Sequence, residues 1–241
     1  SVRVYEDAVG DWWASFVVRI DDSELVQPTA PPTALGIDWG IATTATTTDP
    51  ALDLEFKDIT AQHARNLKKY QRRMALHKLK RDKAEIQAYN RAKKKAARQH
   101  RAARYQREGH GREWANQAAK THRFVAAEDF KPKFLAATTM AKKMHNAAIG
   151  AFKHYLQEAV TKQGGTYVLV PPHYSTMTCS SCAARAKQRL NLNIRVFTCH
   201  DCGFTEDRDR NASLNIRQWA GFNPTIHNGS QPAALSSTAA S

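Results

Sequence analysis

The four cysteines of the chain form two pairs whose spacing suits a metal ion. Each pair is a Cys-x-x-Cys knuckle, and sixteen residues separate the pairs; the cysteines are Cys179, Cys182, Cys199 and Cys202. Two knuckles at this separation bring four thiolates around one tetrahedral Zn²⁺, and four thiolates leave no open position for catalysis. The spacing therefore predicts a structural zinc site, which does not need His173 or His200 as ligands. Disulfides and buried free thiols stay open as alternatives.

Three carboxylates lie at positions where a negative charge is either energetically unfavourable or has a specific role. Asp38 stands inside an apolar strand-like run, Glu128 ends another, and Asp209 is near the start of a helix-forming segment. Oxygen ligands from three separate segments can hold two Mg²⁺ ions that clamp a phosphodiester. Each residue also has a structural interpretation: a turn residue at Asp38, a surface acid at Glu128 and a helix N-cap at Asp209. Spacing alone does not show that the three converge.

The positive charge of the chain is concentrated in one segment. Residues 61–123 hold 20 Lys and Arg against 4 Asp and Glu, a net charge of +16, whereas the whole chain carries +14. Such a segment is typical of a protein that binds a polyanion, nucleic acid above all. The candidate nucleic-acid contacts are Lys68, Lys69, Arg72, Arg73, Lys78, Lys80, Arg91, Lys93, Lys94, Lys95, Arg98, Arg101 and Arg104.

The sequence patterns around these residues predict a mixed α/β protein. The 241 residues, 42% of them hydrophobic and 24% charged, are typical of a globular chain with one large domain and inserts. Alternating or β-branched runs predict strands. These are an opening hairpin over 2–5 and 12–20, two strands around a tight turn at Gly40, a third at 54–56, one at 124–128, one at 166–170, and a ribbon strand at 195–198.

Helices are expected where Ala, Lys, Arg and Leu recur without Gly or Pro. Residues 61–107 predict polar helices that form a projecting antiparallel arm, and Gly109 and Gly111 are expected to end them before a short helix over 114–120. An amphipathic helix is expected over 138–163, and a last helix over 209–220.

The candidate acids and the two cysteine knuckles stand in sequence motifs. Taken in chain order, these motifs resemble the C-terminal half of TnpB-type transposon proteins and the related type V CRISPR effectors. The resemblance spans residues 34–218 and is carried by five motifs: Gly-Ile-Asp-Trp-Gly at 36–40, Glu-Asp-Phe at 128–130, the two cysteine knuckles, and Asp-Arg-Asp-Arg-Asn-Ala at 207–212. It implies an RNase H-like (RuvC) mixed sheet with flanking helices, a projecting basic helical insert and a zinc-ribbon insert. Asp38, Glu128 and Asp209 would be the three acids that hold catalytic Mg²⁺, with Asp207 as the main rival for the last role.

The resemblance also implies a domain order and a function. It places the end of a wedge-like β domain and a linker at 1–30, and RuvC segments I and II at 31–172 around the basic insert 61–122. The zinc ribbon, which would bind target nucleic acid, follows at 173–204, RuvC segment III at 205–221, and a flexible tail at 222–241. The implied activity is cleavage of DNA that is paired with a guide RNA. Ala183 departs from a usual Gly and Ser213 from a usual Ala, and neither change removes a proposed ligand.

Three further expectations concern context. The absence of an initial Met and the early hairpin indicate a piece of a longer protein, so guide RNA, target DNA and a missing N-terminal recognition and wedge portion are the expected partners. Without that portion the chain is not expected to act as a guided nuclease. No apolar run approaches the ~18 residues of a membrane span and no signal peptide is visible, which favours the cytoplasm, with nucleoid association, and no membrane partner.

Two other classes of function remain open from the sequence. One is a cleavage-inactive, RNA-guided DNA-binding protein or repressor, in which the basic helices and the ribbon bind while the acids are idle. The other is a zinc-stabilised structural subunit, which leaves the basic segment and the three acids unexplained.

Overall fold

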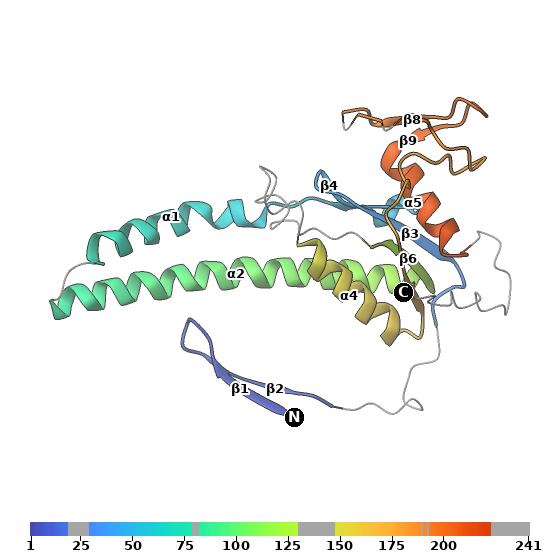
Figure 1. Cartoon of the computed structure of the whole chain (residues 1–241). Coiled ribbons are helices and arrows are strands. Elements are labelled where there is room, and N and C mark those ends of the chain that lie inside the picture. Colours follow the sequence, from blue (N-terminus) through green and yellow to red (C-terminus); the bar gives the residue numbers. More distant parts are fainter. Residues whose placement is uncertain (19–28, 79–81, 130–147, 189, 192, 223–241) are drawn as a thin grey trace, which may run out of the picture.

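A five-stranded mixed sheet organises the molecule (Figure 1). The computed structural model of the chain describes residues 1–18, 29–78, 82–129, 148–188, 190–191 and 193–222. The strands lie in the order β5-β4-β3-β6-β7, with β3 parallel to β6, β6 parallel to β7, and antiparallel pairs β3/β4 and β4/β5. Their bounds are β3 Ala34–Trp39, β4 Thr43–Thr47, β5 Leu54–Glu55, β6 Phe124–Glu128 and β7 Thr166–Val170.

Alternation along the strands gives the sheet two different faces. Leu35, Ile37 and Trp39 of β3 join a core with α2 (Lys83–Thr121) and α4 (Ile149–Lys162). The opposite face of β3 meets α5 (Arg208–Trp219), which approaches so closely that a β-carbon on Gly36 would lie 2.1 Å from the backbone oxygen of Ser213. The residues of β3 and β6 that point to this second face are therefore the ones that α5 can reach.

The basic segment forms the expected antiparallel arm. Helix α1 (Ile59–His77) packs along α2, and the two project from the sheet (Figure 1). The prediction that Gly109 and Gly111 end the second helix is wrong, because α2 continues through both to Thr121. Close packing explains Gly111, since its position lies directly against the rings of Phe152 and Tyr155 on α4. This packing offsets the cost of about 1 kcal/mol that a glycine has within a helix.

This difference between the two glycines gives a matched prediction. Gly109→Ala should raise the free energy of unfolding by up to about 1 kcal/mol, because its β-carbon meets no atom within 4 Å. Gly111→Ala should lower it by about 1–3 kcal/mol, because the β-carbon would lie 2.3 Å from a Phe152 ring carbon. Urea unfolding of both variants measures the effect, and equal changes of the same sign would contradict this packing.

The remaining elements are two small β ribbons and one 3₁₀ turn. The opening hairpin pairs β1 (Val2–Glu6) with β2 (Trp12–Phe16), as predicted. The cysteine region holds β8 (Val196–Thr198) and β9 (Thr205–Asp207), and a 3₁₀ turn, η2 (Pro50–Leu52), precedes β5. The last helix is confirmed as α5, whereas residues 138–147 of the expected amphipathic helix and 223–241 of the expected tail lie outside the described residues. In the described helices no segment is long and apolar enough to cross a membrane.

Candidate functional site

Two of the three predicted acids lie side by side on the face of the sheet that α5 covers. The register of the parallel strands pairs Ile37 with Ala127, so Asp38 and Glu128 follow as neighbours at the carboxyl ends of β3 and β6. Both are buried, with 8% and 7% of their surface exposed. Their side chains share a hydrogen bond, and the backbone N–H of Trp39 donates to Glu128. The pair is thus held by the sheet itself.

The third acid comes from the first turn of α5. The charge of Asp209 acts on Asp38, although its own oxygens accept hydrogen bonds from two arginines. Arg208 donates to Oδ1 from Nε at 3.0 Å and Nη2 at 2.9 Å, and Arg195 Nη1 donates to Oδ2 at 3.0 Å. The N-cap of α5 is Asp207, whose side chain accepts from the backbone N–H groups of residues 209 and 210. The N-cap interpretation of Asp209 is therefore wrong, and Asp207 has a structural role.

Burial and mutual repulsion hold protons on this cluster. Burial raises the pKa of Asp38 well above its ordinary value, the negative charges of Glu128 and Asp209 add to this effect, and Arg208 opposes it. Burial also raises the pKa of Glu128, to about 7. Acids that resist ionisation together are stabilised in their charged form by a nearby cation. Carboxylate oxygens are the ligands that hard divalent ions such as Mg²⁺ prefer. Among the described residues, however, only the four cysteines bring three or more ligand atoms within 4.8 Å of one another, so Asp209 stands farther from the acid pair.

The raised pKa of Glu128 predicts a pH-dependent stability of the Mg²⁺-free chain. Above pH 4.5 the unfolded chain loses a proton that the folded chain keeps until about pH 7, so folding weakens through this window. A shift of this size corresponds to about 3 kcal/mol lost by pH 8. Thermal unfolding at pH 4.5 and 8 should show that Glu128→Gln reduces the loss. The exposed control Glu55→Gln should keep it, and equal pH profiles for all three proteins would contradict the prediction.

The four cysteines converge, as their spacing predicts. Their sulfur atoms all lie within 4.8 Å of one another, with 3.7 Å between Cys179 and Cys202 and 3.6 Å between Cys182 and Cys199. A tetrahedron with Zn–S bonds of 2.3 Å has sulfurs about 3.8 Å apart. Backbone N–H groups of Cys202 and Asp201 point to Cys199 and lower its pKa to about 7, whereas hydrogen bonds with the other three cysteines raise the pKa of Cys182 to about 12. All four cysteines are free, so the disulfide alternative finds no support.

Ala183, the departure from glycine in the first knuckle, adopts a left-handed conformation with φ of 62°. Its N–H still donates to the carbonyl oxygen of Cys179, at 2.9 Å. The knuckle therefore keeps its turn at the expense of a backbone conformation that glycine adopts more easily.

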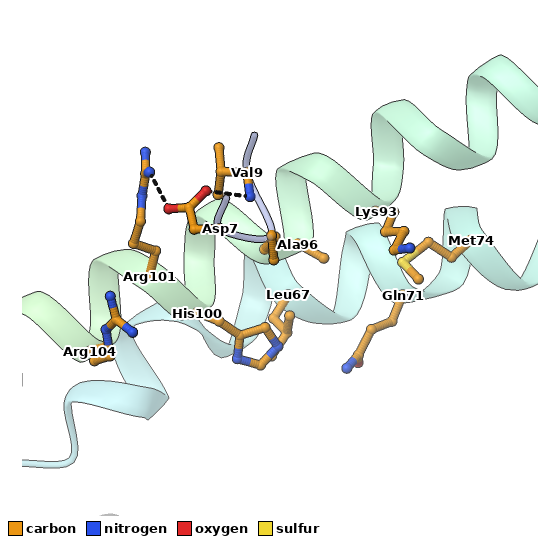
Figure 2. A pocket seen from close by; sticks show the side chains of 12 residues that line it. Asp7, Val9, Leu67, Gln71, Met74, Lys93, Ala96, His100, Arg101 and Arg104 are labelled. Carbon is orange, nitrogen blue, oxygen red and sulfur yellow. Dashed lines mark hydrogen bonds and ion pairs between the residues drawn. The ribbon is translucent and has the colours of Figure 1, made fainter. Parts of the chain in front are cut away.

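Most of the predicted basic contacts are solvent-exposed on the arm. Eleven of the thirteen are exposed, and Lys80 lies outside the described residues. Arg101 differs, because it forms ion pairs with Asp7, at 2.9 Å, and with Asp11 of the hairpin turn. A cavity of about 430 Å³ lies between the turn and the arm. Figure 2 shows the pairing of Arg101 with Asp7 among the residues that line this cavity. Arg101 thus attaches the hairpin to α2 and is already neutralised by carboxylates.

Sequence reasoning missed a second ion pair that fixes the start of α5. Arg210 holds Asp53 with two hydrogen bonds, at 2.6 and 3.2 Å, and also donates to the carbonyl oxygen of Thr47. Asp53 in turn accepts from the backbone N–H of Thr47, at 2.8 Å. These bonds anchor the residue next to Asp209 to the edge of the sheet. The alternating charges of Asp-Arg-Asp-Arg at 207–210 indicate ion pairs, but the sequence does not show which residue pairs with each charge.

Comparisons with known proteins agree with the resemblance that the sequence motifs indicate. The family model described as "Cas12f1-like, TNB domain" matches residues 150–216. The protein named "Putative transposase" from Methanocaldococcus jannaschii is 31% identical over 98 residues, which are 38% of this chain and 90% of that protein. A "Putative RNA-guided DNA endonuclease" from Streptomyces pristinaespiralis is 28% identical over 222 residues, 90% of this chain and 52% of that one.

The fold is also similar to that of a solved structure. A cryo-EM structure of a Cas12f1-sgRNA-target DNA complex matches 89% of this chain and 55% of its own, with a TM-score of 0.52 and 16% identity. At this identity the likeness concerns the fold. The chain spans about half the length of the Cas12f1 chain and of the Streptomyces relative.

Proposed function

Because this chain belongs to the family of TnpB-type transposon proteins and type V CRISPR effectors, we propose that it is the RuvC nuclease portion of an RNA-guided DNA endonuclease. The observation that supports the proposal is the buried pair of Asp38 and Glu128 on the α5 face of the sheet, with Asp209 of α5 near enough for its charge to act on Asp38. The mixed sheet with helices on both faces supports an RNase H-like fold. We assign segments 31–172 and 205–221 to this nuclease fold.

The three acids would hold the catalytic cations. When bound, two Mg²⁺ ions would activate a water and stabilise the leaving 3′ oxygen, so that the water oxygen bonds to phosphorus as the P–O3′ bond breaks, which gives a 5′-phosphate and a 3′-hydroxyl. Asp38 and Glu128 supply their oxygens from adjacent strands, and the Trp39 N–H orients Glu128. Arg208 contacts Asp209 and lies close enough to stabilise the charge of Asp38. The proton that the buried pair shares leaves when cations bind, because the carboxylates must be ionised to act as ligands.

The knuckle region 173–204 would be a zinc ribbon. The tetrahedral spacing of its sulfurs supports a structural Zn²⁺. The ribbon continues through β9 directly into α5, so it lies next to the acid site along the chain. We propose that guide RNA and target DNA are the partners, and that residues 1–30 adjoin an N-terminal recognition and wedge portion that this chain requires for guided cleavage.

The arm would bind the phosphates of the guide–target heteroduplex. Lys68, Lys69, Arg72 and Arg73 are exposed on α1. Replacing all four by Gln should weaken nucleic-acid binding and reduce the slope of log affinity against log salt by up to about 0.9 for each duplex phosphate that these side chains neutralise. A control with exposed Arg3, Lys57, Lys120 and Lys162 changed to Gln removes the same charge outside the arm helix α1 and the ribbon. Equal weakening in both proteins, measured by fluorescence anisotropy, would refute the assignment to the arm.

A cleavage assay tests the proposed function. Labelled single- and double-stranded DNA is incubated with the chain, with and without Mg²⁺ and copurifying RNA, and a Mg²⁺-dependent product is expected. If the full-length protein gives steep, salt-dependent binding and no product, the cleavage-inactive DNA-binding alternative is correct.

A further inference from the structure

Three amide side chains on one face of α5 connect this helix to the first cysteine knuckle. Asn211, Asn215 and Gln218 recur at positions i, i+4 and i+7, which lie on one side of a helix. All their partners are backbone groups of residues 175–180, which lead into the knuckle or belong to it. We call these three side chains the amide ladder.

The bonds of the amide ladder are short and largely shielded from water. Asn211 is fully buried; its Nδ2 donates to the carbonyl oxygen of Thr178 at 2.7 Å, and its Oδ1 accepts from the N–H of Ser180 at 2.9 Å. Asn215 is 1% exposed. The other bonds run from Asn215 Nδ2 to the carbonyl oxygens of Ser175 and Thr178, at 2.8 and 2.7 Å, and from Gln218 Nε2 to that of Ser180, at 2.9 Å. A buried amide that loses such partners costs free energy, so these bonds fix the position of α5 relative to the first knuckle.

The partners of the amide ladder flank a metal ligand. Cys179 lies between Thr178 and Ser180, so the backbone that receives the bonds is the backbone that a bound Zn²⁺ would fix. At the other end, Asn211 stands two residues after Asp209 in the first turn of α5. The segment that leads through β8 into the second knuckle contacts the same turn, because the N–H of Arg208 donates to the carbonyl oxygen of Arg195 at 2.6 Å.

We propose that the amide ladder couples zinc occupancy of the cysteine site to divalent-cation binding at the acid site. This inference rests on the proposed function, which makes Asp209 a cation ligand. With zinc bound, residues 178–180 have a fixed shape, the amide ladder pairs with them, and α5 presents Asp209 to Asp38 and Glu128. Without zinc the knuckle loses that shape, the ladder loses its partners, and the first turn of α5 no longer holds Asp209 in place. The coupling is reciprocal, so cations bound at the acid site raise the affinity of the cysteines for zinc by the same factor.

Mn²⁺ binding provides the test, because free Mn²⁺ is counted by electron paramagnetic resonance without an activity assay. In the wild-type chain, removal of zinc with a chelator, followed by removal of the chelator, should weaken Mn²⁺ binding about tenfold, a typical coupling. The double variant Asn215→Leu, Gln218→Leu should bind Mn²⁺ about tenfold more weakly with zinc present, and zinc removal should change this little further. The matched control Asn116→Leu, Gln117→Leu alters exposed residues of α2 and should behave like the wild type.

The outcomes separate this coupling from the proposed function. Equal Mn²⁺ affinity of the wild type with and without zinc overturns the coupling, and so does full zinc dependence in the ladder variant. Asp38→Ala locates the Mn²⁺ site: if Mn²⁺ binding survives this change, the acids are not the cation ligands and the proposed function fails as well. If Asp38→Ala removes binding while zinc removal leaves it intact, only the coupling fails. Circular dichroism of the ladder variant with zinc bound verifies that its helices are formed.

Discussion

Asp38→Ala is expected to lower the rate of DNA cleavage at least about 1,000-fold while DNA binding stays within about twofold. The carboxylate that this change removes is buried beside Glu128, so the proposed cation site on the two strands would lose one of its ligands. Cation stabilisation of the reacting phosphate is worth several kcal/mol, and each 1.36 kcal/mol added to the barrier slows the reaction by a factor of about ten. Quenched single-turnover reactions on labelled DNA measure the rate, and anisotropy measures binding.

Two further aspartates make this prediction selective. Asp209→Asn should be nearly as inactive as Asp38→Ala, whereas Asp207→Asn should keep most activity, because asparagine caps a helix as well as aspartate does. Cleavage that is undiminished in Asp38→Ala would refute the assignment. If Asp207→Asn is inactive and Asp209→Asn is active, the two aspartates have the opposite roles. Where the chain binds DNA without cutting it, the same variants are compared in the full-length protein.

The sequence singles out each of the three acids, but it does not show how they lie relative to one another. An apolar run that ends in a carboxylate predicts Asp38 and Glu128 as unusual, yet which strands are neighbours depends on the crossover through α1 and α2. A pattern of alternation assigns both acids to one face only once the parallel register of β3 and β6 is known. The effect of the Asp209 charge on Asp38 depends on the position of α5 over that face, which the close approach at Gly36 permits.

Other errors and omissions share a physical cause, namely interactions between segments far apart in sequence. Helix propensity argued that Gly111 ends a helix, but the rings on α4 occupy the space that a side chain would need. Charge density predicts a nucleic-acid contact at Arg101, which stays a prediction, but it did not reveal the two carboxylates of the hairpin that pair with this residue. By contrast, the cysteine spacing is local information, and the knuckles formed as predicted. Local patterns therefore predicted elements and ligand sets, and long-range packing decided which groups meet.

Cys179→Ser is expected to abolish zinc binding and to unfold the ribbon while the five-stranded sheet stays folded. Cys179 is buried at the centre of the cysteine cluster, and the ribbon has a small core of its own, with Phe197 and Cys199 as its other buried members. A core of this size cannot offset the entropy of ordering about thirty residues, whereas structural zinc contributes about 10–16 kcal/mol. Elemental analysis should find one zinc per wild-type chain and almost none in the variant.

Hydrogen exchange distinguishes local from global unfolding in this variant. Amides of β8, β9 and the first turn of α5 should lose protection, and those of β3 and β6 should keep it, because the sheet has its own core with α2 and α4. Ser181→Ala, an exposed change within the same knuckle, should retain zinc and full protection. Wild-type chains that lack zinc and form disulfides under air would revive the alternative that the thiols are paired. Full zinc retention by Cys179→Ser would show that a different ligand completes the site, with His173 and His200 the nearest candidates in the sequence.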